Sequence, residues 1–128
     1  MNNERKTIFL VDDSASSLMV GRNLFSERYN TFTCNSGERM FKLLERITPD
    51  LILLDVEMPE MDGYEIIKRL KSTQNTANIP VIFLTAHDDE EAKNMGLFLG
   101  AIDCITKPFS PPLLLERIAT HFNQIHPV

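Results

Sequence analysis

The sequence predicts an α/β domain in which a parallel five-stranded sheet carries helices on both faces. Short apolar segments alternate along the chain with amphipathic segments of helical period. Two apolar segments, Phe9–Val11 and Val81–Leu84, lack polar alternation, which is typical of strands covered on both faces. The length of 128 residues suits a single domain spanning residues 1–128, with a core over about residues 6–123.

Five short segments rich in apolar or β-branched residues are predicted as strands. In chain order they are Thr7–Val11, Thr31–Cys34, Leu51–Leu54, Val81–Leu84 and Ile102–Ile105. A predicted helix follows each of them. The first helix, about Ser14–Arg28, has the weakest pattern because Gly21 interrupts it. Ser110 followed by Pro111 is typical of a helix start. The other helices show apolar residues at helical spacing: Met40, Leu43, Leu44 and Ile47; Ile66, Ile67 and Leu70; Ala92, Met95, Gly96 and Leu99; Leu114, Ile118, Phe122 and Ile125.

This (βα)5 order predicts a doubly wound, flavodoxin-like sheet, because crossovers between parallel strands are right-handed. In the strand order 2-1-3-4-5, the carboxyl ends of strands 1, 3, 4 and 5 converge on one cleft, and strand 2 lies outside it. The residues that directly follow those four strands are therefore the candidates for a functional site.

Composition and charge argue against several classes of protein. The longest apolar runs have four to six residues, far fewer than the ~20 of a membrane span. No secretory signal opens the chain, so a cytoplasmic location is expected. The net charge of −5 disfavours direct contact with nucleic acid. Cys34 and Cys104 lack CxxC spacing and are expected to be reduced, buried thiols.

The chain's last residues, Asn123–Val128, contain no helix-capping signal. We expect one of two explanations. Either the domain is cut from a longer protein with a C-terminal output domain, or it has a short natural tail.

Chemically active side chains follow the four converging strands. Asp12 and Asp13 follow the first strand, Asp55 the third, Thr85 the fourth and Lys107 the fifth. Each has an ordinary structural interpretation when taken alone, as a helix cap, a turn residue or part of an extended dipeptide. Their coincidence at the strands that should converge favours a shared site instead.

Three carboxylates placed together repel one another unless a cation joins them. Oxygen ligands suit a hard cation, Mg²⁺ before Ca²⁺. A carboxylate beside such a metal can also act as a nucleophile toward phosphorus, and Asp55 stands alone on the central strand. The Thr85 hydroxyl and the Lys107 ammonium could then bind phosphoryl oxygens.

Four motifs together resemble the receiver domain of two-component response regulators, over about Lys6–Phe122. They are Asp12-Asp13-Ser14, Leu54-Asp55-Val56-Glu57-Met58-Pro59-Glu60-Met61-Asp62-Gly63, Thr85-Ala86 and Lys107-Pro108-Phe109. The resemblance implies that Asp55 accepts a phosphoryl group from the phosphohistidine of a histidine kinase or phosphotransfer protein. The domain would assist this reaction without being an enzyme.

The resemblance also implies the remaining roles at the site. Mg²⁺ would be held by Asp12, Asp13, Asp55 and the carbonyl oxygen of Glu57, with Asp13 the more direct ligand of the first two. Thr85 and Lys107 would bind the phosphoryl oxygens, and the Lys107–Pro108 bond would be cis. Glu57 and His87 are hypothesised to tune the lifetime of the phosphate, with two solvated side chains as the alternative. His121 and His126 are interpreted as surface histidines without a role.

Signal output is expected through Thr85 and the fifth strand. In the resembling family an aromatic residue three positions before the lysine rotates with the threonine, whereas Cys104 stands there in this chain. The signalling surface is expected on the predicted helix 88–99, strand 102–105 and helix 111–122. It would contact an output domain, a partner protein or a second copy. Phe98 is interpreted as partly buried, with a partner contact as the alternative.

Three rival interpretations remain. A phosphatase of the haloacid-dehalogenase type would need an Asp where Glu57 stands. A flavin- or nucleotide-binding module would need a Gly/Ser/Thr-rich loop in place of Asp12-Asp13. A degenerate receiver would serve protein contacts alone, although the five key side chains are present.

Overall fold

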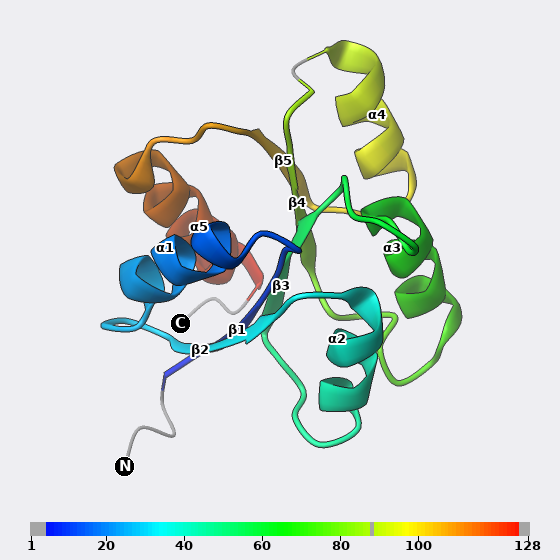
Figure 1. The fold of residues 1–128 in the computed structure, drawn as a ribbon, viewed down its shortest axis with the longest axis horizontal. Coiled ribbons are helices and arrows are strands. Elements are labelled where there is room, and N and C mark those ends of the chain that lie inside the picture. The colour runs from blue at the N-terminus through cyan, green and yellow to red at the C-terminus, as the bar shows by residue number, and fades with distance from the viewer. Residues whose placement is uncertain (1–4, 88, 126–128) are drawn as a thin grey trace.

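The structure is a computed structural model that describes residues 5–87 and 89–125. In this part of the chain a five-stranded sheet runs through the middle of the molecule, with helices on both sides (Figure 1). No helix among the described residues has the length and apolar content that crossing a membrane requires. The strands are β1 (Thr7–Val11), β2 (Asn30–Cys34), β3 (Leu51–Asp55), β4 (Val81–Thr85) and β5 (Asp103–Thr106). The helices are α1 (Ala15–Phe25), α2 (Gly37–Leu44), α3 (Gly63–Ser72), α4 (Glu90–Phe98) and α5 (Pro111–Ile125).

The strand order is β2-β1-β3-β4-β5 and all neighbouring strands are parallel, which confirms the predicted doubly wound fold. The register aligns the carboxyl ends of the strands. Val11 pairs with Leu54 between β1 and β3, and Thr85 pairs with Thr106 between β4 and β5. The residues that follow these four strands therefore meet at one edge of the sheet.

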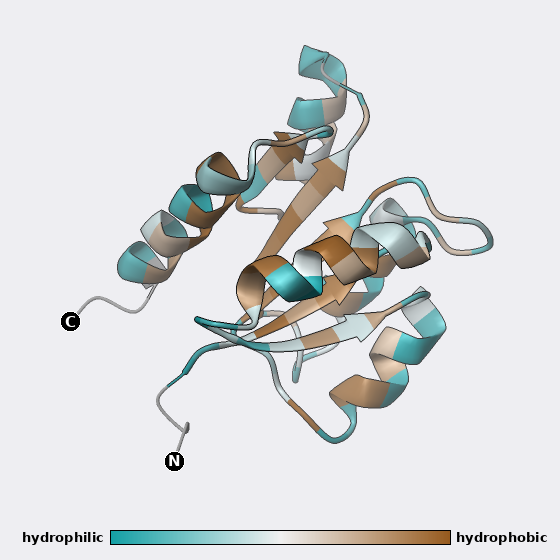
Figure 2. Cartoon of the chain, turned by 60° about the vertical axis from the view of Figure 1, so that its left-hand side comes forward, coloured by the Kyte–Doolittle hydropathy of each residue, from teal (hydrophilic) through white to brown (hydrophobic). Residues whose placement is uncertain are grey.

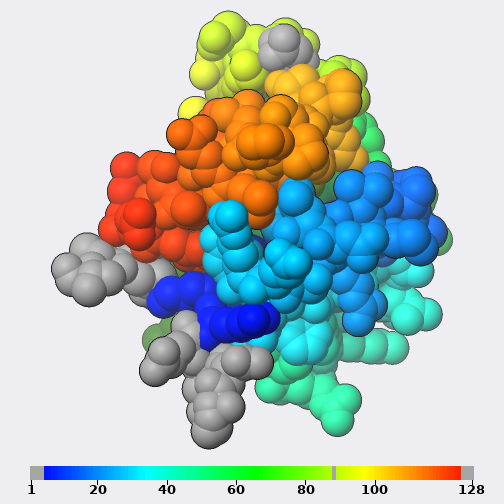
Figure 3. Space-filling model, turned by 90° about the vertical axis from the view of Figure 1, so that its left-hand side faces the viewer, coloured from blue at the N-terminus to red at the C-terminus, as the bar shows by residue number. Residues whose placement is uncertain are grey.

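Successive residues of a strand face opposite helical layers. In β1, Ile8 and Leu10 belong to the core shared with α1 and α5, whereas Phe9 and Val11 belong to the core shared with α2 and α3. Figure 2 shows the resulting arrangement, with the most hydrophobic strands between the two layers. On the surface, α1 and α5 lie side by side on one face (Figure 3). Burial on both sides explains why the central strands have no polar alternation.

Gly63, the first residue of α3, lies against the backbone of β3. A Cβ atom at this position would lie 2.7 Å from the carbonyl oxygen of Asp55 and 2.9 Å from the Cα atom of Val56. The Gly63 N–H donates a hydrogen bond to the Val56 carbonyl at 2.9 Å. Glycine thus allows α3 to begin directly beside the end of the central strand.

Replacing Gly63 with alanine is expected to lower the free energy of unfolding by about 1–3 kcal/mol, because the added methyl group would meet backbone atoms that cannot move aside. Gly37→Ala is the matched control, also at the first residue of a helix. There the Cβ atom would meet the side chain of Ile66, which can adjust, so a smaller loss is expected. Urea unfolding of both variants measures the difference. Equal losses would contradict the proposed close backbone approach.

α1 and α2 end earlier than the sequence predicts. α1 ends at Phe25 rather than near Arg28, where the chain turns and the Arg28 N–H donates to the Phe25 carbonyl at 3.0 Å. α2 ends at Leu44, and Ile47 packs against the core from beyond the helix. α5 runs to Ile125, the last residue of the predicted apolar stripe, and so confirms that stripe in length.

The predicted apolar face of α4 is wrong in part. Only Gly96 of this helix is buried, because its Cβ position would lie 2.7 Å from the Cys104 sulfur and 2.8 Å from the Phe83 ring. With Gly96 facing the sheet, the helical period puts Met95 at the flank of the helix and Phe98 on its far side, where they are 45% and 85% exposed. The interpretation of Phe98 as partly buried is therefore wrong.

The thiol and histidine predictions also need correction. Cys34 is buried as expected, but Cys104 is only half-buried. His121 is not a free surface residue, since its Nε2 atom lies 2.9 Å from Oδ2 of Asp103. His126, which the sequence predicts to lie on the surface, and residue 88, the predicted start of the fourth helix, lie outside the described residues.

Asp103 ties α5 to β5 through His121 and Arg117. Its Oδ2 atom also accepts a hydrogen bond from Nε of Arg117 at 2.9 Å. Burial would raise the pKa of Asp103, but the hydrogen bonds from Arg117 and His121 outweigh burial and hold this pKa below its ordinary value. The spacing of Arg117 and His121, four residues apart on one helix, was the signal in the sequence that both could reach one carboxylate.

Candidate functional site

Three carboxylates meet at the carboxyl edge of the sheet. Asp12 and Asp13 follow β1, and Asp55 is the last residue of β3. Each offers an oxygen atom, and these oxygens all lie within 4.8 Å of one another. Asp12 and Asp55 are buried while Asp13 is exposed, so the cluster opens to solvent on one side. The pairing of β1 with β3 brings the three together, as predicted.

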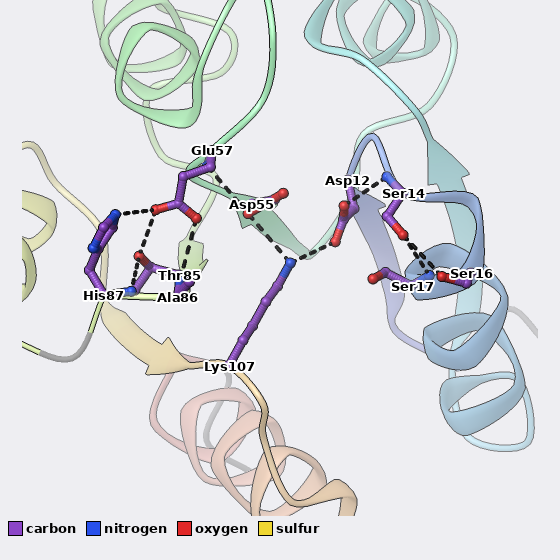
Figure 4. Close-up of polar contacts among 10 residues, drawn as sticks. All are labelled: Asp12, Ser14, Ser16, Ser17, Asp55, Glu57, Thr85, Ala86, His87 and Lys107. Carbon is purple, nitrogen blue, oxygen red and sulfur yellow. Dashed lines mark hydrogen bonds and ion pairs between the residues drawn. The ribbon is translucent and has the colours of Figure 1, made fainter.

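Lys107 lies between two of these carboxylates. Its Nζ atom is 3.0 Å from Oδ2 of Asp12 and 3.5 Å from Oδ1 of Asp55 (Figure 4). The loop that carries it is anchored by a hydrogen bond of 2.7 Å from the Lys107 N–H to the Thr85 carbonyl. The Lys107–Pro108 bond is cis, as predicted.

The ionisation of these groups reflects crowding of negative charge. Burial and the neighbouring Asp12 raise the pKa of Asp55 to about 6, although Lys107 opposes the shift. Burial would lower the pKa of Lys107, but its contacts with Asp12 and Asp55 outweigh burial and raise it. The ammonium group thus remains charged and compensates part of the carboxylate repulsion.

Glu57, Thr85 and His87 form a second cluster beside the first. The Thr85 hydroxyl donates to Oε2 of Glu57 at 3.2 Å, and the Ala86 N–H donates to Oε1 at 3.4 Å. Nε2 of His87 lies 3.2 Å from Oε2 of Glu57. The Glu57 N–H in turn donates to Oδ1 of Asp55 at 3.3 Å, which links the two clusters. No pattern in the sequence indicates that the Glu57 side chain reaches Thr85.

Cys104, at the position predicted to take part in switching, lies under α4. Its thiol donates to the carbonyl oxygen of Lys93 at 3.8 Å, and it pairs with Phe83 across β4 and β5. The Phe83 ring packs edge-on against Tyr64, with ring centroids 5.5 Å apart. An aromatic pair next to Cys104 thus occupies part of the space beneath α4.

The donor set suits a hard divalent cation. Carboxylate oxygens are the ligands that Mg²⁺ prefers, and the exposed side of the cluster leaves room for water ligands. Asp55 combines burial, a partner cation in Lys107 and a place at the open edge. This arrangement can support covalent chemistry at the Asp55 carboxylate.

Known proteins resemble this chain over nearly its whole length. Residues 8–119 match the family model described as response regulator receiver domain. A transcriptional regulatory protein for alkaline phosphatase synthesis, PhoP of Bacillus subtilis, is 44% identical over 114 residues, which are 88% of this chain and 47% of PhoP. A probable cyclic di-GMP phosphodiesterase of Vibrio cholerae is 41% identical over 117 residues, which are 91% of this chain and 26% of that protein.

Solved structures of receiver domains also match this chain over nearly its whole length. The receiver domain of a Francisella response regulator superposes with a TM-score of 0.87 at 31% identity, covering 94% of this chain and 99% of that domain. The receiver domain of a histidine kinase from Syntrophus aciditrophicus gives 0.86 at 32% identity, covering 96% and 94%. The chain spans about a quarter to a half of the curated relatives described above. The chain belongs to the response regulator receiver domain family.

Proposed function

We propose that Asp55 is the phosphoacceptor of this receiver domain and takes its phosphoryl group from a phosphohistidine of a histidine kinase or phosphotransfer protein. The observation that carries the proposal is the convergence of Asp12, Asp13 and Asp55 with Lys107 at the open edge of the sheet. In the transfer, a carboxylate oxygen of Asp55 forms a bond to phosphorus. The P–N bond of the donor breaks, and its electron pair stays on the imidazole nitrogen.

The other residues of the site hold and neutralise charge during transfer. Asp12, Asp13 and Asp55 would bind Mg²⁺ together with the carbonyl oxygen of Glu57. When bound, this cation offsets the negative charge of the transferred group. Lys107 turns from the carboxylates to a phosphoryl oxygen, and Thr85 donates its hydroxyl to another. The domain assists its own phosphorylation and dephosphorylation and is not a free-standing enzyme.

Signal output is proposed to pass through Thr85 and Cys104 to the surface formed by α4, β5 and α5. The exposed Met95, Leu97 and Phe98 give this surface an apolar character suited to a protein contact. Because the chain matches only part of longer relatives, an output domain in the same protein is one proposed partner. A second copy of the domain is another. A cytoplasmic location is proposed from the need to meet a kinase.

Intact mass spectrometry after incubation with Mg²⁺ and acetyl phosphate tests the proposal. The wild-type protein is expected to gain one phosphoryl group, and Asp55→Asn is expected to gain none because the amide is a poor nucleophile. Asp50→Asn serves as the control, since Asp50 lies at the opposite end of the sheet, where it accepts a hydrogen bond from the Thr7 N–H. A folded wild-type protein that gains no phosphoryl group would contradict the proposed function.

A further inference from the structure

The Glu57 carboxylate occupies an anion-binding position inside the site. It accepts hydrogen bonds from the Thr85 hydroxyl at 3.2 Å and from the Ala86 N–H at 3.4 Å. The His87 ring lies 3.2 Å away on the same carboxylate (Figure 4). Two donors and the His87 ring, all from the segment Thr85–His87, thus surround a carboxylate that belongs to the protein itself.

The Thr85 hydroxyl has only one hydrogen to give. Its oxygen already accepts a hydrogen bond from the His87 N–H at 3.1 Å. The hydrogen points to Glu57 in this structure and cannot point to a phosphoryl oxygen at the same time. Contact of Thr85 with Glu57 and contact of Thr85 with a phosphoryl group therefore exclude each other.

We infer that Glu57 is an internal competitor of the phosphoryl group, which holds Thr85 and Ala86 until a phosphoryl group displaces it. This inference rests on the proposed function of Asp55. It assigns Glu57 a positioning role in the unphosphorylated protein, distinct from any effect on the lifetime of the phosphate.

Charge and space both allow the displacement. A phosphoryl group on Asp55 would add about −1.5 to −2 charge near the Glu57 carboxylate and repel it. Glu57 and His87 line an open pocket of about 420 Å³, together with Tyr64 and Asp62 among others. Since both side chains are more than 40% exposed, they can swing into this pocket without unpacking the core.

The competition lowers the apparent affinity of the site for a phosphoryl group, because only the fraction of molecules with Thr85 released can bind it fully. If Thr85 is engaged by Glu57 nine-tenths of the time, release raises the apparent affinity about tenfold. Shortening the side chain by one methylene group in Glu57→Asp keeps the charge but withdraws the carboxylate from Thr85 and Ala86.

The test measures binding of fluoroberyllate, a phosphoryl mimic, in the presence of Mg²⁺. Glu57→Asp and Glu57→Ala are expected to lower the dissociation constant about 3- to 10-fold relative to wild type. Glu60→Gln removes a negative charge from an exposed residue on the same loop, outside this cluster, and is expected to leave the constant unchanged. Glu57→Ala and Glu60→Gln each remove one negative charge, but only Glu57→Ala also removes the contact with Thr85. Comparing the two variants separates the loss of that contact from a general effect of charge.

A second measurement examines the contact without any phosphoryl mimic. The amide resonance of Ala86 in the metal-free protein is expected to shift in Glu57→Asp and to stay in place in Glu60→Gln. An unchanged or weaker fluoroberyllate affinity in Glu57→Asp and Glu57→Ala would overturn the inference while leaving Asp55 as phosphoacceptor. A wild-type protein that binds no fluoroberyllate and gains no phosphoryl group would instead overturn the proposed function, and this inference with it.

Discussion

Phosphorylation of the Lys107→Met variant by acetyl phosphate is expected to be about 100- to 1000-fold slower than that of the wild type. A decrease of this size is typical when one preorganised group is removed from the place where negative charge develops in the transition state. Methionine keeps much of the apolar stem of the side chain and removes the ammonium that lies 3.0 Å from Asp12 and 3.5 Å from Asp55. The rate is measured by intact mass over time.

The same variant should be less stable at neutral pH, by about 1–3 kcal/mol, because two buried carboxylates lose their cation. How this loss of stability changes with pH follows from the raised pKa of Asp55. The pKa of Asp55 is raised from 3.8 to about 6 in the folded protein, so the cost of burying its charge is absent below 3.8, grows as the pH rises to about 6 and is complete above it. Without Lys107 the pKa rises further, and the loss measured by urea unfolding should be larger at pH 7.5 than at pH 5.

Lys71→Met is the matched control for both measurements. Lys71 donates to the carbonyl oxygens of Ala77 and Ile79 at 3.0 and 3.1 Å, remote from the carboxylates. Its loss should lower stability without changing the rate of phosphorylation. A Lys107→Met protein that is phosphorylated at the wild-type rate would contradict the assignment of Lys107.

The Asp13→Asn variant is expected to bind Mg²⁺ about 10- to 100-fold more weakly, the loss typical when a group that supports a metal site is removed. Without Mg²⁺ the variant should unfold at the same or a higher urea concentration, because one of three crowded negative charges has been neutralised. A loss of Mg²⁺ affinity together with an unchanged or higher stability of the metal-free protein would identify Asp13 as a ligand rather than a structural residue.

Titration of Mg²⁺ followed by amide resonances measures the affinity, and urea unfolding in EDTA measures the stability. Asp62→Asn is the control, since Asp62 caps α3 through its hydrogen bond to the Glu65 N–H at 2.9 Å and asparagine caps equally well. An Asp13→Asn protein with unchanged Mg²⁺ affinity would remove Asp13 from the proposed ligand set.

The fold and the position of the site could be predicted because both depend on local patterns. Unbroken apolar strands require two covering layers, and right-handed crossovers then give a doubly wound parallel sheet. The order 2-1-3-4-5 agrees with the positions of the reactive side chains after strands 1, 3, 4 and 5. The place of Asp55 at the end of β3 follows from that order without knowledge of any contact. The order also separates the second strand, which ends at Cys34, from the site.

The predictions for α4 and for His121 were wrong because tertiary packing, rather than the periodicity of the sequence, decides which of these side chains are buried. The α4 stripe has helical spacing, yet Gly96 is buried against Phe83 and Cys104 and Leu99 packs partly against the core, while Met95 of the same stripe is exposed. Phe98, on the far side of the helix, is exposed as well. His121 contacts Asp103 because α5 lies over β5. The four-residue spacing of Arg117 and His121 indicates that both can reach one carboxylate, but the sequence does not indicate which carboxylate lies there.

By itself, the sequence determined the α/β class of the sheet and the set of side chains that follow its strands, because apolar runs and strand ends are properties of consecutive residues. Only the tertiary structure decided which of those side chains touch. It placed Lys107 between Asp12 and Asp55 and turned the Glu57 carboxylate onto Thr85, Ala86 and His87. Such contacts join residues from different strands and depend on side-chain rotamers, which are selected only when the surrounding elements are in place.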